Sequence, residues 1–311
     1  MQNYILKDEN SVFYECGYSC DNEIFLKIGD EAYFFTDARY TQDAKDHIKN
    51  AQVIESKDLL KSVREILRKN RAKKLFFDPK DFTTFEFEEL KKSGIYLAPK
   101  PNFSWKKRAI KSEEEIALIK NSVKINNLAF DRYSSYLKNS GIGKSEKFLQ
   151  YKAKEILSNF GEFDLSFEPI FAINENSAKP HAHPTSKILK EKDLVLFDAG
   201  IKYKRYCSDR TRTSFFTQNI DFNFGQKFKT KKIQKVYDLV LKAHDETIKR
   251  ARSGMLAKDI DKIAREIIDK GGFGDFFIHS TGHGVGLDIH EMPFISPKSS
   301  IVIEENMVFT I

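Results

Sequence analysis

Cysteine is scarce in this chain of 311 residues, and its scarcity excludes two kinds of stabilisation. Cys16, Cys20 and Cys207 are odd in number, form no Cys-x-x-Cys pair and have no histidine nearby. A disulfide framework or a structural zinc site needs more cysteines at closer spacing. We therefore expect three inert thiols rather than a redox site, and a cytoplasmic location.

Long apolar runs, repeats and glycine- or proline-rich stretches are missing as well. Only 15 Gly and 8 Pro occur, which excludes collagen-like and low-complexity proteins. No segment approaches the roughly 18 uncharged apolar residues of a membrane span, and the first 15 residues lack the pattern of a secretory signal. With 41% hydrophobic and 31% charged residues, the composition is that of a globular protein with no membrane partner, and the length predicts two domains.

A strong concentration of charge is also absent, although the chain is basic. There are 52 Lys and Arg against 45 Asp and Glu, a net charge of +7. The densest basic run, residues 227–235, is predicted to be a loop that enters a helix. A solvated helix face explains that run better than a nucleic-acid surface does, so we expect no nucleic-acid partner.

The first hundred residues alternate short β-like runs with charged helical stretches. Residues 23–28 and 32–36 flank Gly29-Asp30, which predicts a hairpin. An apolar stripe over residues 58–70 predicts a helix, and residues 74–77 predict another strand. The pattern indicates a small α/β domain over residues 1–110, closed by a linker at residues 98–105, where two prolines interrupt any periodicity.

A second domain is predicted over residues 111–311. It begins with a capping box, Ser112-Glu-Glu-Glu115, which satisfies free amides at a helix start. Helices are expected at residues 112–138, 145–160, 231–252 and 257–270. Strand-rich sequence lies between the second and third helices, and glycine-rich strand sequence follows the fourth. The fold class is therefore α/β (α+β).

Two aspartates near the middle of the second domain form the first candidate site. Asp198 ends the apolar run LVLF, and Asp209 follows in the segment SDRTRT. A hairpin turn centred between residues 203 and 204 would place Asp198 directly opposite Asp209. Opposed like charges repel, and a shared divalent cation would remove that repulsion. The alternative is that Asp209 pairs with a neighbouring arginine while Asp198 caps a turn.

A cluster of histidines and glycines forms the second candidate site. His279, His283 and His290 fall within twelve residues, FIHSTGHGVGLDIHE, and the glycines allow close backbone approach. Imidazole is a metal ligand and a proton shuttle near neutral pH. In a strand, His279 and His283 would share a face. Three histidines in this pattern favour a site over structural roles.

A third, weaker candidate is the segment Lys179-Pro-His181-Ala-His-Pro184, where prolines hold the chain extended. Two aspartates and a histidine make a hard, mixed oxygen and nitrogen ligand set, which suits Mn²⁺, Co²⁺, Fe²⁺ or Zn²⁺. No dinucleotide, P-loop, nucleophile-elbow or HExxH motif competes with it.

These motifs together resemble the metallopeptidase family of aminopeptidase P, prolidase, methionine aminopeptidase and creatinase. The carriers are FDAG with SDRTRT and then HSTGHGVGLDIHE. Upstream, NSVFY, CGY and FTDARY resemble the N-terminal domain of the aminopeptidase P and prolidase branch. The resemblance covers essentially the whole chain. It implies a pita-bread metallopeptidase domain preceded by a smaller creatinase-type α/β domain.

The resemblance also implies roles for individual residues. Asp198, Asp209 and His283 match metal ligands for two divalent ions, most often Mn²⁺, which share a bridging hydroxide. His181 and His290 match substrate-binding histidines that handle protons, and His279 matches a further catalytic position on the substrate side. Family members often dimerise, so a homodimer is compatible with the resemblance.

The match to the family stops short of the full ligand set. Two glutamate ligands are expected beyond the present residues, one just after a sequence like Met307-Val-Phe-Thr-Ile311. Glu304 and Glu305 precede that run and do not match by position. An apolar β run at the last residue is unusual. We therefore expect a C-terminally truncated chain with impaired catalysis.

The leading functional hypothesis is an aminopeptidase that cleaves the Xaa-Pro bond at a peptide N-terminus. The proline preference comes from the resemblance alone. The alternatives are a creatinase-like amidinohydrolase, and a catalytically inactive module of the same fold that binds peptides or proteins. The absent glutamates favour the inactive module, whereas the retained aspartates and histidines argue against it.

Overall fold

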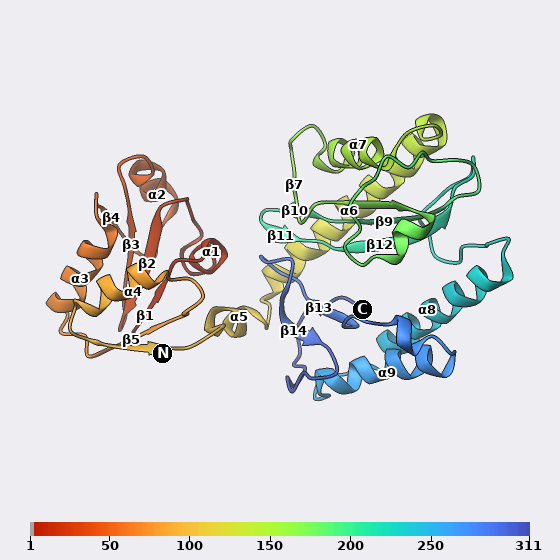
Figure 1. The fold of residues 1–311 in the computed structure, drawn as a ribbon. Coiled ribbons are helices and arrows are strands. Elements are labelled where there is room, and N and C mark those ends of the chain that lie inside the picture. Colours follow the sequence, from red (N-terminus) through yellow and green to blue (C-terminus); the bar gives the residue numbers. More distant parts are fainter. Residues whose placement is uncertain (1–2) are drawn as a thin grey trace. The chain divides into compact units, whose positions relative to one another are not determined.

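The structure is a computed structural model that describes residues 3–311. The chain divides into two compact units, of which one ends at Arg108 and the other begins at Ala109. Each unit contains helices packed on a sheet, and the elements are labelled in Figure 1. The α/β class predicted from the alternation of strand-like and helical segments is confirmed for both units.

The first unit is built on a mixed sheet of six strands in the order β4-β3-β2-β1-β5-β6. The two central pairings, β1 with β2 and β2 with β3, are antiparallel, and the outer three are parallel. The strands are β1 (Asn3–Leu6), β2 (Glu23–Ile28), β3 (Glu31–Thr36), β4 (Gln52–Glu55), β5 (Lys74–Phe77) and β6 (Tyr96–Pro99).

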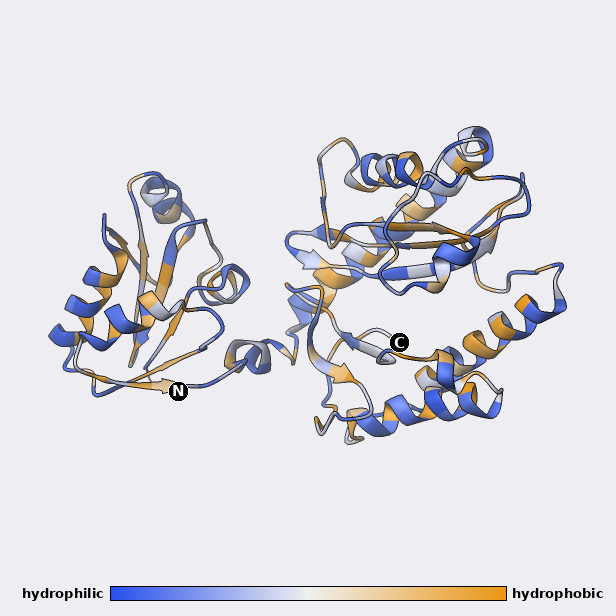
Figure 2. Cartoon of the chain, in the orientation of Figure 1, coloured by the Kyte–Doolittle hydropathy of each residue, from blue (hydrophilic) through white to orange (hydrophobic). Residues whose placement is uncertain are grey.

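Helices cover both faces of this sheet, because successive side chains of a strand point to opposite faces. Ile24 and Leu26 pack in one core with residues of α3 and α4, whereas Phe25 packs in the other with residues of α1, α2 and α5. In Figure 2 the strands are largely orange and the helices alternate orange with blue, as this packing requires. The helices are α1 (Glu9–Cys16), α2 (Thr41–His47), α3 (Leu59–Lys69), α4 (Thr84–Lys91) and α5 (Phe103–Arg108).

The predicted hairpin, helix and strand of this unit are confirmed, but the predicted linker is wrong. Residues 98–105 contain the end of β6 and the start of α5. Ala98 and Phe103 are 5% and 3% exposed. Proline is tolerated in β6 because this strand lies at the edge of the sheet, where a missing N–H breaks no ladder.

In the second unit, two helices pack on a sheet of three strands. The capping box of Ser112 and Glu115 opens α6 (Glu113–Ser140), as predicted, and Ser145 caps α7 (Glu146–Ser158). Phe130 and Tyr133 of α6 pack on Phe197 at the centre of the core. The sheet order is β12-β9-β8, with β8 (Ile170–Ile173), β9 (Leu194–Ala199) and β12 (Arg210–Phe215). A short sheet of β7 (Asp164–Leu165), β10 (Ile201–Tyr203) and β11 (Tyr206–Cys207) adjoins it in sequence.

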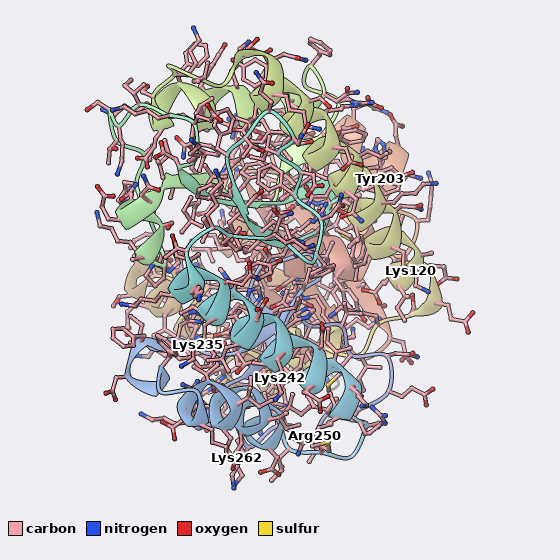
Figure 3. All side chains as sticks on the ribbon, turned by 90° about the vertical axis from the view of Figure 1, so that its right-hand side faces the viewer. Lys120, Tyr203, Lys235, Lys242, Arg250 and Lys262 are labelled. Atoms are coloured by element: carbon pink, nitrogen blue, oxygen red, sulfur yellow. The ribbon has the colours of Figure 1, made fainter. Side chains whose placement is uncertain are left out.

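The rest of the second unit consists of two helices and a two-stranded sheet. The predicted helices appear as α8 (Lys231–Arg250) and α9 (Ala257–Lys270), which pack against each other, and α9 also contacts β14. The strands are β13 (Gly282–Gly284) and β14 (Glu291–Ile295). In Figure 3, Lys235, Lys242 and Arg250 follow one another along α8, with Lys262 on the neighbouring α9. All four of these side chains are exposed, so these positive charges lie on solvated helix faces.

The register of the central hairpin differs from the prediction. Lys202 pairs with Cys207 and Tyr203 with Tyr206, so the turn is formed by Lys204 and Arg205. Both turn residues have positive φ, of 46° and 72°, which fits the twist of a two-residue hairpin turn. Neither residue is a glycine or an asparagine, which favour positive φ, so the sequence did not predict this turn.

The shifted turn moves the partner of Asp198 by two positions. Asp198 lies opposite Thr211 and not opposite Asp209, which corrects the predicted direct opposition. Because side chains alternate with a period of two residues, a shift of two positions keeps the side chain on the same face. Asp209, two residues before Thr211, is therefore diagonal to Asp198.

The cysteines and the helices bear on two predictions made from composition. All three cysteines are free thiols, with Cys16 and Cys207 buried and Cys20 partly buried. Within residues 3–311, none of the helices combines the length and the apolar character that crossing a membrane requires.

Candidate active site

Asp198 lies near the end of β9 in a partly enclosed position. The Thr211 hydroxyl donates a hydrogen bond of 2.7 Å to Oδ1 of Asp198 across the strand pair. Burial, followed by the charge of Asp209, raises the pKa of Asp198 to about 7. Loss of solvation and a nearby like charge both disfavour the ionised carboxylate. The two aspartates therefore lie within electrostatic range of each other, although they are not directly opposite.

His283 joins this pair of aspartates from the short strand β13. Its Nε2 lies 3.3 Å from Oδ2 of Asp209, and its Nδ1 lies 3.1 Å from the carbonyl oxygen of Gly284. Burial lowers the pKa of His283, but the Asp209 contact and the Gly284 carbonyl outweigh burial, so the net shift is upward. The carbonyl contact favours a proton on Nδ1, which leaves Nε2 directed at Asp209.

Backbone contacts bring the two motifs together. The amide of Cys207 donates a 2.8 Å hydrogen bond to the carbonyl of Gly286, which joins the hairpin to the histidine segment. The amide of Thr310 donates to the carbonyl of His283 at 2.8 Å. A Cβ at Gly282 would lie 1.9 Å from the carbonyl oxygen of Thr310. Glycine is required there because only a bare backbone allows this approach.

His290 lies next to His283, and His181 acts on His290 through its charge. The ring centroids of His283 and His290 are 4.3 Å apart, with the rings steeply inclined at 68°. Burial lowers the pKa of His290, and the neighbouring His283 and His181 lower it further, while Asp209 opposes the shift. His181 is an exposed residue of the segment after β8, and its charge acts on His290. The structure therefore shows Asp209, His283 and His290 side by side, with Asp198 and His181 within electrostatic range of members of this group.

His279 is not gathered with the others, and the predicted strand does not include it. It lies in a bend before β13 and is exposed, with its Nδ1 2.7 Å from the carbonyl of Ser280. Arg265 donates a hydrogen bond of 2.9 Å to the carbonyl of His279, and its partner Asp261 accepts from Thr281. Residue 279 therefore lies outside β13, and the strand in which His279 and His283 would share a face does not extend to His279.

The donor set suits a hard divalent cation. Two carboxylates and an imidazole are oxygen and nitrogen ligands of the kind that Mn²⁺, Co²⁺, Fe²⁺ and Zn²⁺ accept. Burial raises the pKa of Asp198 first, and the charge of Asp209 raises it further, so a cation bound near both carboxylates would favour the ionised form. Across residues 3–311, however, no group of three or more His, Cys, Asp or Glu side chains is arranged closely enough to hold an ion. Among these three side chains, the contact that the structure shows directly is that of Asp209 with His283.

A buried ion pair near His290 has no signal in the sequence. The Nζ of Lys111 lies 2.5 Å from Oε1 of Glu291, and both side chains are 1% exposed. Glu291 directly follows His290, and Lys111 directly precedes the Ser112 cap. Nothing in the sequence joins two residues 180 positions apart, so only the fold could reveal the pair.

Comparison with known proteins gives the class of the chain and then its relatives. Residues 117–311 match metallopeptidase family M24, and residues 1–104 match the creatinase/prolidase N-terminal domain. The first match covers more than half of the chain. The chain therefore belongs to metallopeptidase family M24, which confirms the resemblance, the pita-bread domain and the creatinase-type domain before it.

Individual relatives are similar over almost the whole chain. The uncharacterized peptidase YqhT of Bacillus subtilis is 31% identical over 99% of this chain and 84% of its own length. The Xaa-Pro dipeptidase of Bacillus anthracis has a TM-score of 0.89 at 27% identity, covering 99% of this chain and 84% of that one. The X-Pro aminopeptidase of Thermotoga maritima has a TM-score of 0.86 at 26% identity, covering 99% and 86%.

Proposed function

We propose that this chain is a metal-dependent aminopeptidase that hydrolyses the N-terminal Xaa-Pro bond of peptides. The observation that carries the proposal is the contact of His283 with Asp209 and His290 on a family M24 fold, with Asp198 within electrostatic range. The preference for proline rests on the relatives, since proteins named for X-Pro and Xaa-Pro cleavage share the fold.

The proposed metal ligands are Asp198, Asp209 and His283. Divalent ions bound there, most simply two Mn²⁺, would supply Lewis acidity at the scissile carbonyl and activate the attacking water. Asp209 orients the imidazole of His283 through the 3.3 Å contact with Nε2, and the Gly284 carbonyl holds the other ring nitrogen. The ring thus has one orientation available for binding.

The proposed substrate residues are His290 and His181, with His279 as a further catalytic histidine from the neighbouring loop. His290 lies against His283 and has a lowered pKa, first from burial and then from its histidine neighbours. A neutral imidazole near pH 7 can donate one hydrogen bond to a peptide carbonyl and accept a proton elsewhere. His181 would act from the other side of the peptide, at the tip of its loop.

The resemblance implies five protein ligands, and Asp198, Asp209 and His283 match three of them. The remaining two are glutamates, which also supply the family's general base.

Two other functions are supported by specific observations. An Xaa-Pro dipeptidase activity is supported by the similarity to the Bacillus anthracis enzyme. A peptide- or protein-binding module without catalysis is a further alternative on the same fold. A creatinase-like amidinohydrolase remains the third alternative, because the N-terminal domain is shared with that branch.

The test is to count bound Mn²⁺ per chain after equilibration and removal of excess metal, and then to assay hydrolysis of Ala-Pro-Ala, Ala-Pro and creatine. We expect Mn²⁺ binding that weakens at least about tenfold in Asp209→Asn. Hydrolysis of the tripeptide alone supports the aminopeptidase, and hydrolysis of the dipeptide supports the dipeptidase.

The control is Asp164→Asn, which makes the same change of charge at an exposed position of β7. It should leave Mn²⁺ binding unchanged. Equal metal affinity in Asp209→Asn and the parent chain would overturn the ligand assignment. Peptide binding without hydrolysis, even at high Mn²⁺, would favour the inactive module.

The setting of the proposed activity follows from the same considerations. Short peptides with proline in second position are the proposed partners, and a homodimer is compatible with the family. The three free thiols agree with a reducing compartment, so we propose the cytoplasm.

A further inference from the structure

The loop that carries His181 is attached to one buried carboxylate, Glu146. This residue opens α7, but its side chain turns into the protein and is fully buried. The amide of Ile173 donates to Oε1 at 2.7 Å. The amide and hydroxyl of Thr185 donate to Oε2 at 2.7 and 2.6 Å, and the side-chain amide of Asn176 donates at 2.9 Å.

These donors come from both ends of the same loop. Ile173 is the last residue of β8, and Thr185 lies just beyond the proline that follows the histidines. The side-chain amide of Asn176 also donates to the carbonyl of His183 at 3.0 Å, so it links Glu146 to the part of the loop that contains His183. Glu146 therefore holds the two ends of the loop together, while His181, which lies between them in sequence, stays exposed.

The charge on Glu146 suits this arrangement. A buried carboxylate is stable only when its oxygens accept several hydrogen bonds, and here four donors are available within 2.9 Å. Hydrogen bonds to an ionised acceptor are stronger than neutral ones. The strength of the attachment therefore depends on the carboxylate. A glutamine cannot replace it, because its side-chain NH₂ group is a donor and would face backbone or side-chain donors where the carboxylate has an accepting oxygen.

We propose that Glu146 is a positioning residue, which fixes the loop over residues 173–185 and so holds His181 where the peptide binds. The part that concerns the peptide rests on the proposed function. Glu146 touches neither substrate nor metal in this role and acts only through the loop. The proposal assigns a function to a residue that no sequence motif marked.

The test variant is Glu146→Gln, which keeps size and shape but removes the charge. Losing charge-assisted hydrogen bonds should raise hydrogen exchange of amides in residues 174–185 by about tenfold or more. Exchange in the middle of α6 should stay unchanged. The same variant should bind the tripeptide Ala-Pro-Ala, in the presence of Mn²⁺, about tenfold more weakly than the parent chain.

Gln150→Leu is the matched control. Gln150 lies one turn further along α7, is 9% exposed, and donates to the carbonyl of Pro169, outside the loop. It should destabilise the helix without changing exchange over residues 174–185. If Glu146→Gln fails to fold, Thr185→Val removes a single donor and should give a smaller increase of exchange in the same segment.

A double variant separates positioning from general destabilisation. If Glu146 acts through His181, then Glu146→Gln adds no further loss of tripeptide affinity to His181→Ala. Additive losses would overturn the proposal, as would unchanged loop exchange in both Glu146→Gln and Thr185→Val. If the parent chain does not bind the tripeptide at all, the proposed function fails, and the exchange measurement alone still decides whether Glu146 fixes the loop.

Discussion

Two residues that belong to no motif, Lys111 and Glu291, form an ion pair with each side chain 1% exposed. Burying two charges costs several kcal/mol in lost solvation, and their mutual attraction offsets that cost only while both are present. Lys111 is further held by a hydrogen bond from its amide to the carbonyl of Asn306, at 3.0 Å. The pair thus joins the start of the second unit to the segment that carries His290.

Removing the lysine alone should be strongly destabilising. Lys111→Met takes away the ammonium that faces the buried carboxylate of Glu291, which should lower the free energy of unfolding by about 3–5 kcal/mol. Urea denaturation followed by circular dichroism measures the change. The double variant Lys111→Met with Glu291→Leu should recover part of the loss, because both charges of the pair are then gone. A single variant as stable as the parent would contradict the role of the pair.

Asp81 in the first unit predicts a dependence of stability on pH. Burial, followed by the charges of Asp78 and Asp8, raises the pKa of Asp81 to about 7. Its ordinary value is 3.8, so between these two values the unfolded chain ionises while the folded chain holds the proton. This difference lowers stability as pH rises through that window, and the full penalty applies above it.

Asp81→Asn should therefore stabilise the protein at pH 8 and not in acid. Since Asp81 is only partly buried, solvent screening reduces the gain to about 1–2 kcal/mol. The gain over the parent should shrink as pH falls and disappear near about pH 3.5. Denaturant midpoints of the two proteins across this range give the measurement, and a gain independent of pH would rule out the titration of Asp81 as its cause.

At the scale of elements, the hairpin of β10 and β11 turns on two residues with unfavourable backbone conformations. Lys204 and Arg205 both have positive φ, which costs an ordinary side chain about 1 kcal/mol. Asparagine tolerates this region better, because its short side chain bonds locally. Exposed Lys204 is the residue that can be exchanged with the least disturbance.

We expect Lys204→Asn to raise the free energy of unfolding by about 0.5–1 kcal/mol. The same exchange at Lys202, inside β10, should lower it, since asparagine is a poor strand residue. Thermal unfolding of both variants checks the pair of signs. If both exchanges lower the free energy of unfolding equally, the positive φ of the turn is not what limits the stability of this hairpin.

Local signals in the sequence were sufficient to predict most helices and strands, but not the pairing of Asp198 or the position of His279. The capping box at Ser112 lies within four residues and predicted the start of α6 correctly. The pairing partner of Asp198 depends on positive φ at residues 204 and 205, which their side chains do not signal. The bend that removes His279 from β13 is made by Asp261 and Arg265, which lie 14 to 20 residues earlier. Periodicity within a segment cannot represent such contacts.

At the scale of the whole molecule, each unit has hydrophobic cores of its own. Those of the first unit lie on either face of its sheet, and those described for the second unit are formed by residues of that unit. The proposed metal ligands all belong to the second unit. A ligand that binds only the folded state stabilises the cooperative unit to which it binds.

Mn²⁺ should therefore raise the unfolding midpoint of the second unit and leave that of the first unchanged. At a concentration about 100 times the dissociation constant, the stabilisation is about 2.7 kcal/mol. Calorimetry with and without Mn²⁺ measures the shift, and Asp209→Asn should abolish it. An equal shift of both transitions, or a shift that survives in Asp209→Asn, would mean that the ion binds elsewhere.

The close approaches around β13 restrict which second mutations could repair a damaged site. At Gly282 the obstacle to any larger residue is the carbonyl oxygen of Thr310, and a main-chain atom is present whatever residue occupies position 310. At Gly286 the obstacle is the carboxylate of Glu291, whose Oε1 would lie 2.4 Å from an added Cβ. Shortening Glu291 would make room at Gly286 but would weaken the buried ion pair with Lys111. In a genetic screen, we therefore expect second-site suppressors to be rarer for mutations at position 282, where a main-chain atom is the obstacle, than at position 286, where a side chain is.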